Sequence, residues 1–503
     1  QKTRELKDAI EKENLQKLDE FRINDADFGI YEVFLESSTR TKESFRNAAN
    51  FHHVKLNDLV TNLSSFNKGE SYKDTFNTLI GYRNSIFIIR STVEGVCKWL
   101  EMESGEYAKR NGLKGRASFI NAGDGKHEHP TQELLDEFTF LEDNNWSTKK
   151  IHIALVGDLY HGRTVHSKAD GLKLFEDVEV DLIAPKELKM PDYYKLKMKV
   201  NGFKVREFAS IDEYIKQEKV AKIWYFTRPQ LERMGDDVLQ ITDRLRYSIT
   251  FRQDLIPLLD EKTRFYHPLP RHKDHPTIPT FLDTTHFNGW ERQSINGMYV
   301  RMTLLSMFAG KIGSDFVPTE KKVEVDFGGE EYIVQVSLND KTRKGSDSFA
   351  EGVRPITEGI VIDHICRGQE PAAIRKHISK IIKVMKLESG KGGEWVSTST
   401  KDKNVFKGII FRPGAFTLER RDLKRLAAVA PGCTLNIIKD AKISEKYRVH
   451  LPPRIYNFAD IACTNSSCIS HPSQSEGVPP VFHKTEDDHY VCKYCGCSHT
   501  FEE

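Results

Sequence analysis

The stretch Glu36-Ser-Ser-Thr-Arg-Thr41 lies between an apolar segment at residues 28–35 and a segment at residues 45–51 whose apolar side chains recur at helical spacing. We therefore expect a strand that turns directly into a helix at these hydroxyls. The first N–H groups of a helix have no partner within the helix, and the helix dipole favours negative charge, so this turn is suited to binding an anion. The guanidinium of Arg40 matches the oxygens of a phosphate. Taken alone, the stretch could also be a simple helix cap beside a surface arginine.

The composition is that of a globular protein with several domains. The chain has 503 residues, of which 38% are hydrophobic and 29% are charged, and its mean hydropathy is −0.52. The 75 basic and 73 acidic residues give a net charge of +2, which argues against a partner that is a nucleic acid or a membrane. No apolar run is long enough to predict a membrane span. The cysteines gather near the C-terminus, which indicates a metal site in a reducing cytoplasm rather than a disulfide scaffold.

Between residues 28 and about 310, short apolar runs alternate with helical stretches, a pattern typical of doubly wound parallel sheets. The runs are residues 85–89, 117–120, 151–156, 178–183, 223–226 and 264–266. Ligands of such sheets bind beyond the carboxyl ends of the strands. Polar or cationic groups follow most of these runs on turns rich in glycine and proline, namely Arg90, His129 to Gln132, Gly157 to Thr164, Arg228 with Gln230, and His267 to Arg271. We expect them to converge on one anion-binding site.

The cationic groups predict a substrate, or a pair of substrates, with several negative charges. They are Arg40, Lys68, Arg90, Arg163, Arg228 and Arg271. This half shows no Cys-His or Ser-His-Asp arrangement and no acidic cluster for a catalytic metal. We therefore expect catalysis by positioning two anionic molecules and by stabilising the charge that develops between them. His129 is placed to polarise a carbonyl or move a proton, whereas His267 is expected to be structural.

The second half of the chain has a different organisation. Residues 312–352 are charged and glycine-rich, and we interpret most of them as a linker, although residues 323–326 and 332–337 alternate like a small hairpin. Beyond them, an α+β pattern predicts strands near 359–363, 394–399, 405–411 and 433–438, and helices near 371–386 and 417–429. The expected segments are α/β subdomains at 1–135 and 136–311, the linker, an α+β domain at 353–455 and a small β domain at 456–503.

Four cysteines have the spacing of a structural zinc site. Cys463 and Cys468 form one ligand pair, and Cys492 and Cys495 form another. Four thiolates leave no open position for chemistry at the ion. Cys497 competes with Cys495, but Cys-x-x-Cys is the better ligand pair. By residue chemistry alone this half could be a zinc-ribbon nucleic-acid module, yet the near-zero net charge and the absence of a basic run interleaved with aromatic residues argue against it.

The motifs of the first half resemble, in the same order, those of the aspartate and ornithine carbamoyltransferases. They are Ser38-Thr39-Arg40-Thr41, His129-Pro-Thr-Gln132, Gly157-Asp with Gly162-Arg163-Thr164, and His267-Pro-Leu-Pro-Arg271. The resemblance covers roughly residues 28–310 and implies the carbamoyltransferase fold. It also implies that carbamoyl phosphate binds to Ser38, Thr39, Arg40, Thr41 and Arg90. Thr41 and His129 would contact the carbamoyl oxygen, and Gln132 would hold the amino group.

The resemblance also implies the second substrate and the assembly. An amino acid would be held by Arg163, Arg228, Gln230 and the backbone of Leu269 and Pro270. Ser64 and Lys68 would reach the site of a neighbouring subunit, so the active unit would be a trimer within a homo-oligomer. Glu36, Arg163 and Arg233 resemble charges that the family pairs anew as its two subdomains close. The chain departs from the family at Ser91-Thr92 and at Pro229.

Two features favour aspartate over ornithine as the second substrate. The ornithine enzymes have His-Cys-Leu-Pro where this chain has His267-Pro-Leu-Pro270. A pair of arginines, Arg163 and Arg228, suits a dicarboxylate and would repel a cationic amino acid.

The second half resembles the regulatory chain of bacterial aspartate carbamoyltransferase. Residues 465–471 and the surrounding cysteines are similar to its zinc domain, and residues 358–365 are similar to the start of its ferredoxin-like nucleotide domain. The resemblance implies that ATP, CTP or UTP contacts Asp363, His364, Lys407 and Lys446. The whole chain would be a fusion of catalytic and regulatory chains that makes carbamoylaspartate for pyrimidine synthesis. The alternatives are a carbamoyltransferase for another amino acid and a zinc-containing nucleotide-sensing scaffold with an inactive catalytic half.

Overall fold

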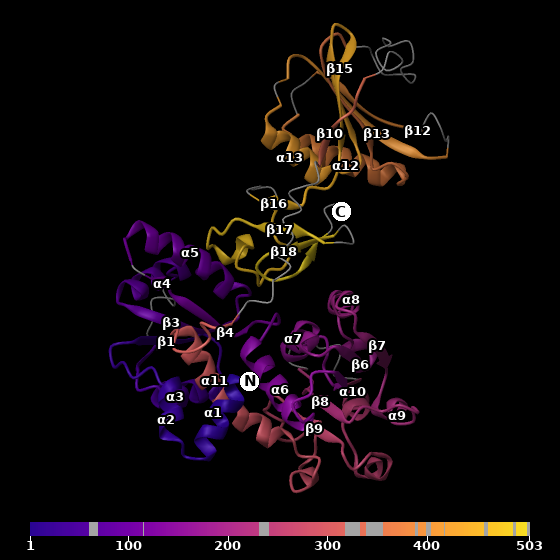
Figure 1. Cartoon of the computed structure of the whole chain (residues 1–503). Coiled ribbons are helices and arrows are strands. Elements are labelled where there is room, and N and C mark those ends of the chain that lie inside the picture. The colour runs from indigo at the N-terminus through magenta and orange to yellow at the C-terminus, as the bar shows by residue number, and fades with distance from the viewer. Residues whose placement is uncertain are drawn as a thin grey trace. The chain divides into compact units, whose positions relative to one another are not determined.

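The computed structural model describes residues 1–59, 69–113, 115–230, 241–316, 332–338, 356–387, 391–398, 404–416, 418–456, 461–485 and 489–499. The chain forms two compact units, of which the first contains residues 1–317 and the second contains most of residues 318–503 (Figure 1). Among the helices of the described residues, none combines the length and the apolar character that a membrane crossing needs.

The first unit begins with a parallel four-stranded sheet. Its strand order is β2 (Lys55–Asp58), β1 (Gly29–Phe34), β3 (Asn84–Ser91) and β4 (Ser118–Asp124). The connections are α3 (Thr39–Phe51), α4 (Tyr72–Gly81) and α5 (Val96–Arg110), and α6 (Pro130–Asp143) follows β4. Nearly every residue of β3 is buried, as expected for a parallel strand that is covered on both faces. The helices α1 (Lys2–Glu11) and α2 (Leu15–Phe21) precede the sheet, and α11 (Trp290–Phe308) lies beside α1, α3 and α6 (Figure 1).

A second parallel sheet completes the first unit. Its strand order is β7 (Lys204–Phe208), β6 (Asp177–Ile183), β5 (Lys150–Val156), β8 (Ile223–Phe226) and β9 (Arg264–Tyr266). Its helices are α7 (Arg163–Gly171), α8 (Asp192–Val200), α9 (Ile211–Tyr214) and α10 (Thr242–Ile249). The prediction of two parallel sheets with alternating helices is confirmed. The core of this sheet is rich in large aromatic side chains, and Trp224, Tyr225 and Phe265 are all 0% exposed.

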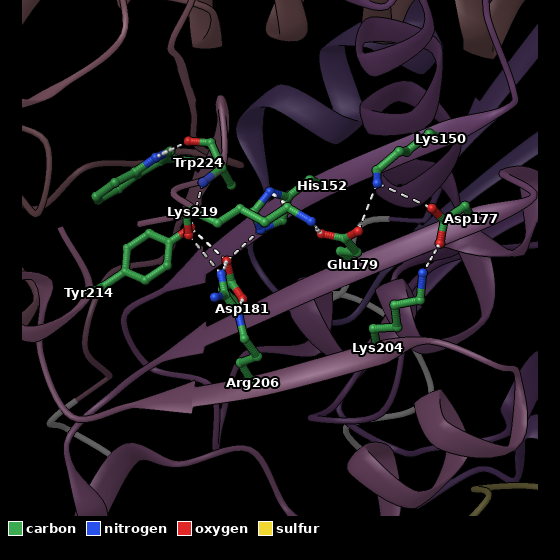
Figure 2. A network of polar contacts seen from close by, with 11 residues as sticks. Lys150, His152, Asp177, Glu179, Asp181, Lys204, Arg206, Tyr214, Lys219 and Trp224 are labelled. Atoms are coloured by element: carbon green, nitrogen blue, oxygen red, sulfur yellow. Dashed lines mark hydrogen bonds and ion pairs between the residues drawn. The ribbon is translucent and has the colours of Figure 1, made fainter. Parts of the chain in front are cut away.

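A polar network covers one face of β5, β6 and β7 (Figure 2). Asp177, Glu179 and Asp181 point to this face because successive side chains of a strand alternate. Nitrogen-bearing side chains of neighbouring segments contact each carboxylate: Lys150 and Lys204 at Asp177, Lys150 and Lys219 at Glu179, and His152 and Arg206 at Asp181. The hydrogen bonds from its two lysines lower the pKa of Glu179 to about 2. These pairs stabilise the register of the three strands.

The second unit contains two antiparallel sheets. The larger has the order β10 (Ile333–Gln335), β15 (Lys442–Val449), β14 (Thr434–Lys439), β11 (Gly359–Ile365), β13 (Phe406–Pro413) and β12 (Gly393–Thr398). Its helices are α12 (Pro371–Val384) and α13 (Arg420–Val429). The smaller has the order β16 (Arg454–Tyr456), β17 (Val481–Lys484), β18 (Tyr490–Cys492) and β19 (Ser498–His499). The strands and helices predicted between residues 359 and 438 are therefore confirmed.

One short strand lies within the segment that we interpreted as a linker. β10 pairs in antiparallel fashion with β15, so residues 333–335 form an edge strand of the larger sheet. The hairpin partner expected at residues 323–326 lies outside the described residues. The alternating pattern at residues 332–337 therefore reflects pairing with β15, which is more than a hundred residues further along the chain.

Candidate active site

The turn between β1 and α3 is formed by the stretch Glu36-Ser-Ser-Thr-Arg-Thr41. β1 ends at Phe34, Ser38 precedes the helix, and α3 begins at Thr39. Phe45 is among the α3 side chains that are fully buried against the sheet, which fixes the direction of the helix. The side chain of Ser38 makes no capping hydrogen bond, so the alternative of a simple helix cap is not supported. The first N–H groups of α3 and the nearby hydroxyls are thus directed toward the neighbouring cavity.

This cavity has a volume of about 850 Å³ and lies where the strands of both sheets end. It is lined by all the predicted substrate-binding residues that the structure describes. These are Ser38, Thr39, Arg40, Thr41, Arg90, His129, Gln132, Arg163, Arg228, Gln230, Leu269 and Pro270. Ser64, Lys68 and Arg233 lie outside the described residues. The structure therefore brings the predicted groups together, while their individual roles stay predictions.

The arginines give the cavity a positive character. Burial lowers the pKa of Arg40. Arg90 and Arg163 are mostly buried, and both approach the carboxylate of Glu36: Nη1 of Arg163 lies 2.9 Å from Oε2, and Nε of Arg90 lies 3.4 Å from it. Backbone carbonyls also hold them, since Arg90 donates to Ala122 O and Arg163 donates to Gly125 O. A single carboxylate thus holds two guanidinium groups close together at a site that is suited to anions.

His129 is held at the start of α6, where Pro130 occupies the first helical position. The backbone N–H of His129 donates to Ser167 Oγ at 3.2 Å, and the residue is 5% exposed. Burial and the nearby charges of Arg163 and Arg90 lower the pKa of His129 well below its usual range. The ring is therefore a neutral imidazole, which can donate one N–H to a carbonyl oxygen without adding a charge.

The other end of the cavity is built from the ends of β5, β8 and β9. Gln230 donates its backbone N–H to Asp158 Oδ2 at 2.9 Å and its side-chain amide to His161 O at 3.1 Å. Gly157, after β5, has a φ of +122°, and a Cβ there would lie 2.3 Å from Thr227 O, so only glycine allows this close approach to β8. The backbone N–H of Leu269 donates to Nδ1 of His267 at 2.8 Å, which fixes the turn after β9.

One of the predicted arginines does not belong to the cavity. Arg271 donates to both carboxylate oxygens of Asp283, at 2.6 and 3.1 Å, and its guanidinium lies over the ring of Trp290. It is absent from the described residues that line the cavity. The expectation that Arg271 adds to the charge of the anion site is therefore wrong, because its carboxylate partner lies in the segment that follows.

Other residues also line the cavity, among them His267 and Arg301. His267 was expected to be structural; it orients the turn at Leu269 and also faces the cavity, and burial lowers its pKa to about 3. Arg301, in the middle of α11, was not predicted at all. Its burial lowers its pKa to about 10. No motif surrounds Arg301, and the only available signal is a charged side chain in a largely apolar helix.

The predicted nucleotide residues lie on the larger sheet of the second unit. Lys407 Nζ, on β13, lies 2.9 and 3.0 Å from the two carboxylate oxygens of Asp363, on β11. Nδ1 of His364 lies 3.1 Å from Thr434 Oγ1. Burial and nearby cations, which include Lys407 and Lys446, lower the pKa of His364. Asp363 raises this pKa, but the net shift is downward. Lys446 is on β15, which β14 separates from β11.

The four predicted cysteine ligands form one buried cluster. The sulfurs of Cys463, Cys468, Cys492 and Cys495 all lie within 4.8 Å of one another. Sγ of Cys463 lies 3.7 Å from Sγ of Cys495, which is close to the separation of about 3.8 Å expected for two thiolates on one tetrahedral zinc ion. Cys497 does not belong to this group of described residues. Sequence reasoning missed His499, whose Nε2 lies 3.5 Å from the sulfur of Cys463.

Comparison with known proteins agrees with both halves of this arrangement. A protein of Treponema denticola named Protein PyrBI is 69% identical over 502 residues, covering 100% of this chain and 94% of that protein. A protein of the same name from Thermotoga maritima is 49% identical over 507 residues, again covering 100% of this chain and 94% of that protein.

Four family models also match. Residues 1–142 match the aspartate/ornithine carbamoyltransferase carbamoyl-P binding domain, and residues 149–308 match the Asp/Orn binding domain. Residues 351–450 match the allosteric domain of the aspartate carbamoyltransferase regulatory chain, and residues 453–503 match its metal binding domain. The chain belongs to the aspartate carbamoyltransferase family.

In this member of the aspartate carbamoyltransferase family, the catalytic and regulatory parts form a single polypeptide. It is a carbamoyltransferase. Among solved structures, the catalytic subunit of M. jannaschii aspartate transcarbamoylase is 31% identical, with a TM-score of 0.50, and covers 61% of this chain and 92% of that chain. The metal binding domain matched at residues 453–503 contains the cysteine cluster.

Proposed function

We propose that the cavity binds carbamoyl phosphate and L-aspartate and catalyses formation of N-carbamoyl-L-aspartate and phosphate. The observation that carries this proposal is the arrangement of charge in one cavity. The start of α3, Arg40 and Arg90 supply anion-binding groups from the first sheet, and Arg163 and Arg228 supply them from the second. Two anionic substrates would therefore be held against each other without a metal ion between them.

Carbamoyl phosphate would bind at the α3 end of the cavity. Its phosphate would accept hydrogen bonds from the first backbone N–H groups of α3 and from Ser38, Thr39, Arg40 and Arg90. Its carbonyl oxygen would accept from Thr41 and from the neutral ring of His129. Oε1 of Gln132 would accept from its amino group.

Aspartate would bind at the other end of the cavity. Arg163 and Arg228 would hold its two carboxylates, and Gln230 and the backbone at Leu269 and Pro270 would complete the contacts. Ornithine carries a positive side chain, which these arginines would repel. The charge of the site therefore favours aspartate as the carbamoyl acceptor.

The reaction would be an attack of the aspartate amine on the carbonyl carbon. A C–N bond forms, the carbonyl oxygen gains negative charge, and the bond to the phosphate oxygen then breaks. Thr41, Arg40 and His129 would stabilise the charged oxygen because their donors are fixed before the reaction begins. The phosphate would take the bonding electron pair, accept the proton that the amine loses, and remain at the positive start of α3.

The second unit would bind effector nucleotides such as ATP, CTP and UTP. Asp363, His364, Lys407 and Lys446 would together contact the base, ribose and phosphates of the nucleotide. Nucleotides that prefer one state of the assembly would shift its population toward that state.

Zinc is the ion that best suits the cysteine cluster. Four thiolates at mutual distances up to 4.8 Å match a closed tetrahedral site, and hard cations such as Mg²⁺ prefer oxygen ligands. The bound ion would cross-link the segments that carry the ligands and so stabilise the small β domain.

We further propose an assembly of catalytic trimers in the cytoplasm, in which Ser64 and Lys68 complete a neighbouring site. The reduced cysteine cluster suits a reducing compartment. The domain bounds given from the sequence, with subdomains meeting near residue 135 and a zinc domain from residue 456, remain part of this proposal.

The test is formation of carbamoylaspartate against aspartate concentration, with and without ATP and CTP, and with ornithine in place of aspartate. Turnover with aspartate alone, together with a saturation curve shifted by nucleotide, is the expected result. Turnover with ornithine would overturn the acceptor assignment. Turnover without any nucleotide shift would support the catalytic proposal and overturn the regulatory one. No turnover at saturating substrates would overturn the catalytic proposal.

A further inference from the structure

The carboxylate of Asp136 orients two glutamine side chains that line the cavity. Nε2 of Gln132 donates to Oδ1 of Asp136 at 2.8 Å, and Nε2 of Gln293 donates to the same oxygen at 2.6 Å. A carboxylate can only accept, so both amides turn their NH₂ groups toward Asp136 and their oxygens away from it. Asp136 is 0% exposed and Gln293 is 1% exposed, so bulk water does not compete for these hydrogen bonds.

The same carboxylate is connected to the opposite end of the cavity. Oε1 of Gln293 accepts the backbone N–H of His267 at 2.9 Å, and Nδ1 of His267 accepts the backbone N–H of Leu269 at 2.8 Å. Gln293 can accept from His267 only because its NH₂ group is directed to Asp136. The orientation of one buried carboxylate is therefore linked to both ends of the cavity.

Lys168 forms a buried ion pair with Asp136. Its Nζ lies 2.7 Å from Oδ2 of Asp136 and also contacts Glu133, and the residue is 0% exposed. Burial alone would lower the pKa of Lys168, but the two carboxylates outweigh this effect and raise it. Gly171, on the same helix, makes room for the cluster, since a Cβ there would lie 2.1 Å from Oε1 of Glu133.

We propose that Lys168 and Asp136 are positioning residues that make the enzyme select the amino group of its carbamoyl donor. The inference rests on the proposed function and concerns the orientation of Gln132. Because the NH₂ group of Gln132 is held by Asp136, the amide oxygen is the end left for the substrate. A carbamoyl group offers an N–H to that oxygen, whereas an acetyl group offers only a methyl. A turned amide would place its NH₂ against the substrate NH₂, where neither group can accept.

The D136N variant tests this inference because Lys168 remains beside it. The ammonium of Lys168 attracts the oxygen of the new amide, so the NH₂ group of that amide faces Gln132 and Gln293 and forces both to turn. In the D136N/K168M double variant the cation is gone, so the amide oxygen can again accept from both glutamines. The substitution K168M would thus restore the orientation of the two glutamines that D136N reverses.

The readout is selectivity between two phosphates of similar shape. Selectivity is here the ratio of the inhibition constant of acetyl phosphate, measured as a competitor, to the KM for carbamoyl phosphate. We expect D136N to lower this selectivity at least 10-fold and D136N/K168M to return it to within about 3-fold of the wild type. The matched control is E133Q, which alters the other carboxylate at Lys168 without touching Gln132, and its selectivity should stay within about 3-fold of the wild type.

If D136N does not fold, two double variants that lack the buried ion pair provide the comparison. D136N/K168M keeps an acceptor for Gln132, whereas D136L/K168M removes it, so only D136L/K168M should lose selectivity. Equal losses of affinity for both phosphates, or equal selectivity in the two double variants, would overturn the inference. Wild-type enzyme that forms no carbamoylaspartate would instead overturn the proposed function, and this is measured before any variant.

Discussion

Oε2 of Glu36 accepts a hydrogen bond from Nη1 of Arg163 at 2.9 Å. Glu36 follows β1 of the first sheet, and Arg163 begins α7 after β5 of the second sheet. Nε of Arg90 lies 3.4 Å from the same carboxylate oxygen. One carboxylate therefore holds guanidinium groups from both halves of the first unit and reduces the repulsion between them.

Replacing Glu36 by glutamine should weaken aspartate binding. Gln retains the shape of the side chain but not its charge, so Arg163 loses a charged partner and faces Arg90 without compensation. A hydrogen bond to a charged group contributes about 1.5–3 kcal/mol, which corresponds to about a 10- to 100-fold rise in KM for aspartate. The KM for carbamoyl phosphate should change less than about 3-fold, because the start of α3 remains intact.

Steady-state kinetics with each substrate varied in turn would measure this effect. E187Q is the matched control, since Glu187 pairs with the exposed side chain of Arg244 and does not line the cavity among the described residues. Equal changes in the two KM values for E36Q, or no change in either, would contradict the role given to Glu36.

Removing the charge of Arg228 should affect aspartate alone. R228M keeps much of the length of the side chain but removes its donors, so kcat/KM for aspartate should fall about 100-fold, as expected for a lost charged hydrogen-bonding pair. Titration calorimetry should find carbamoyl phosphate binding unchanged. R244M removes an exposed arginine of the same unit and serves as the control. A parallel loss of carbamoyl phosphate binding would show that Arg228 does not act on aspartate specifically.

The parallel sheets could be predicted because their strands are nearly continuous apolar runs. Residues 151–156, for example, correspond to β5, whose side chains are buried on both faces. The strand at residues 333–335 was harder to place because an edge strand depends on its partner. β10 is three residues long, and its partner β15 is distant in the sequence.

Much of the cavity could be predicted for a related reason. Arg90 lies at the carboxyl end of β3, His129 and Arg163 come after β4 and β5, and the carboxyl ends of parallel strands meet at one edge of the sheet. Gln293 and Arg301 are different because they lie on α11, a helix of 19 residues near the end of the unit. Which side of such a helix faces the cavity is decided by its packing against α3 and α6. No local pattern contains that information.

The error at Arg271 has the same origin. The sequence motif predicted that Arg271, after β9, adds positive charge to the cavity. Its charge is instead paired with the carboxylate of Asp283, which lies in the segment that follows. An arginine near a strand end can belong to a substrate site or to a structural ion pair, and the sequence alone does not distinguish them.

Protonation of His267 should destabilise the first unit at low pH. Its pKa is about 3 in the folded protein, against an ordinary value of 6.5, because burial and nearby arginines disfavour the charged ring. The unfolded chain therefore binds a proton below pH 6.5 that the folded chain does not. The contribution to stability is complete above pH 6.5 and is lost as the pH falls toward 3, at up to about 1.4 kcal/mol per pH unit.

The variant H267N isolates this effect. The oxygen of Asn can accept the N–H of Leu269 in place of Nδ1, but it does not titrate. Between pH 7.5 and 5, the free energy of unfolding should fall by about 2 kcal/mol less in H267N than in the wild type. Urea unfolding followed by tryptophan fluorescence, to which the buried Trp224 and Trp290 of this unit contribute, would measure it. H272N, at an exposed histidine, should keep the wild-type slope, and equal slopes in all three proteins would exclude this role of His267.

The two C-terminal cysteines at positions 495 and 497 should differ sharply in metal binding. Cys495 belongs to the four-sulfur cluster, whereas Cys497 lies outside the group among the described residues. C495S leaves three thiolates and a hydroxyl, so the ion should be released easily, while C497S should keep one ion per chain. Mass spectrometry of the metal content after dialysis would give the stoichiometry of each variant and identify the ion.

Metal loss should also destabilise the small β domain, because the free energy of binding contributes to its folding. Strong chelators should therefore lower the melting temperature of the domain in the wild type and in C497S to the value found for C495S without chelator. If C495S retains one metal ion per chain and C497S loses it, Cys497 rather than Cys495 is the ligand. Retention by both variants would mean that the ion binds elsewhere.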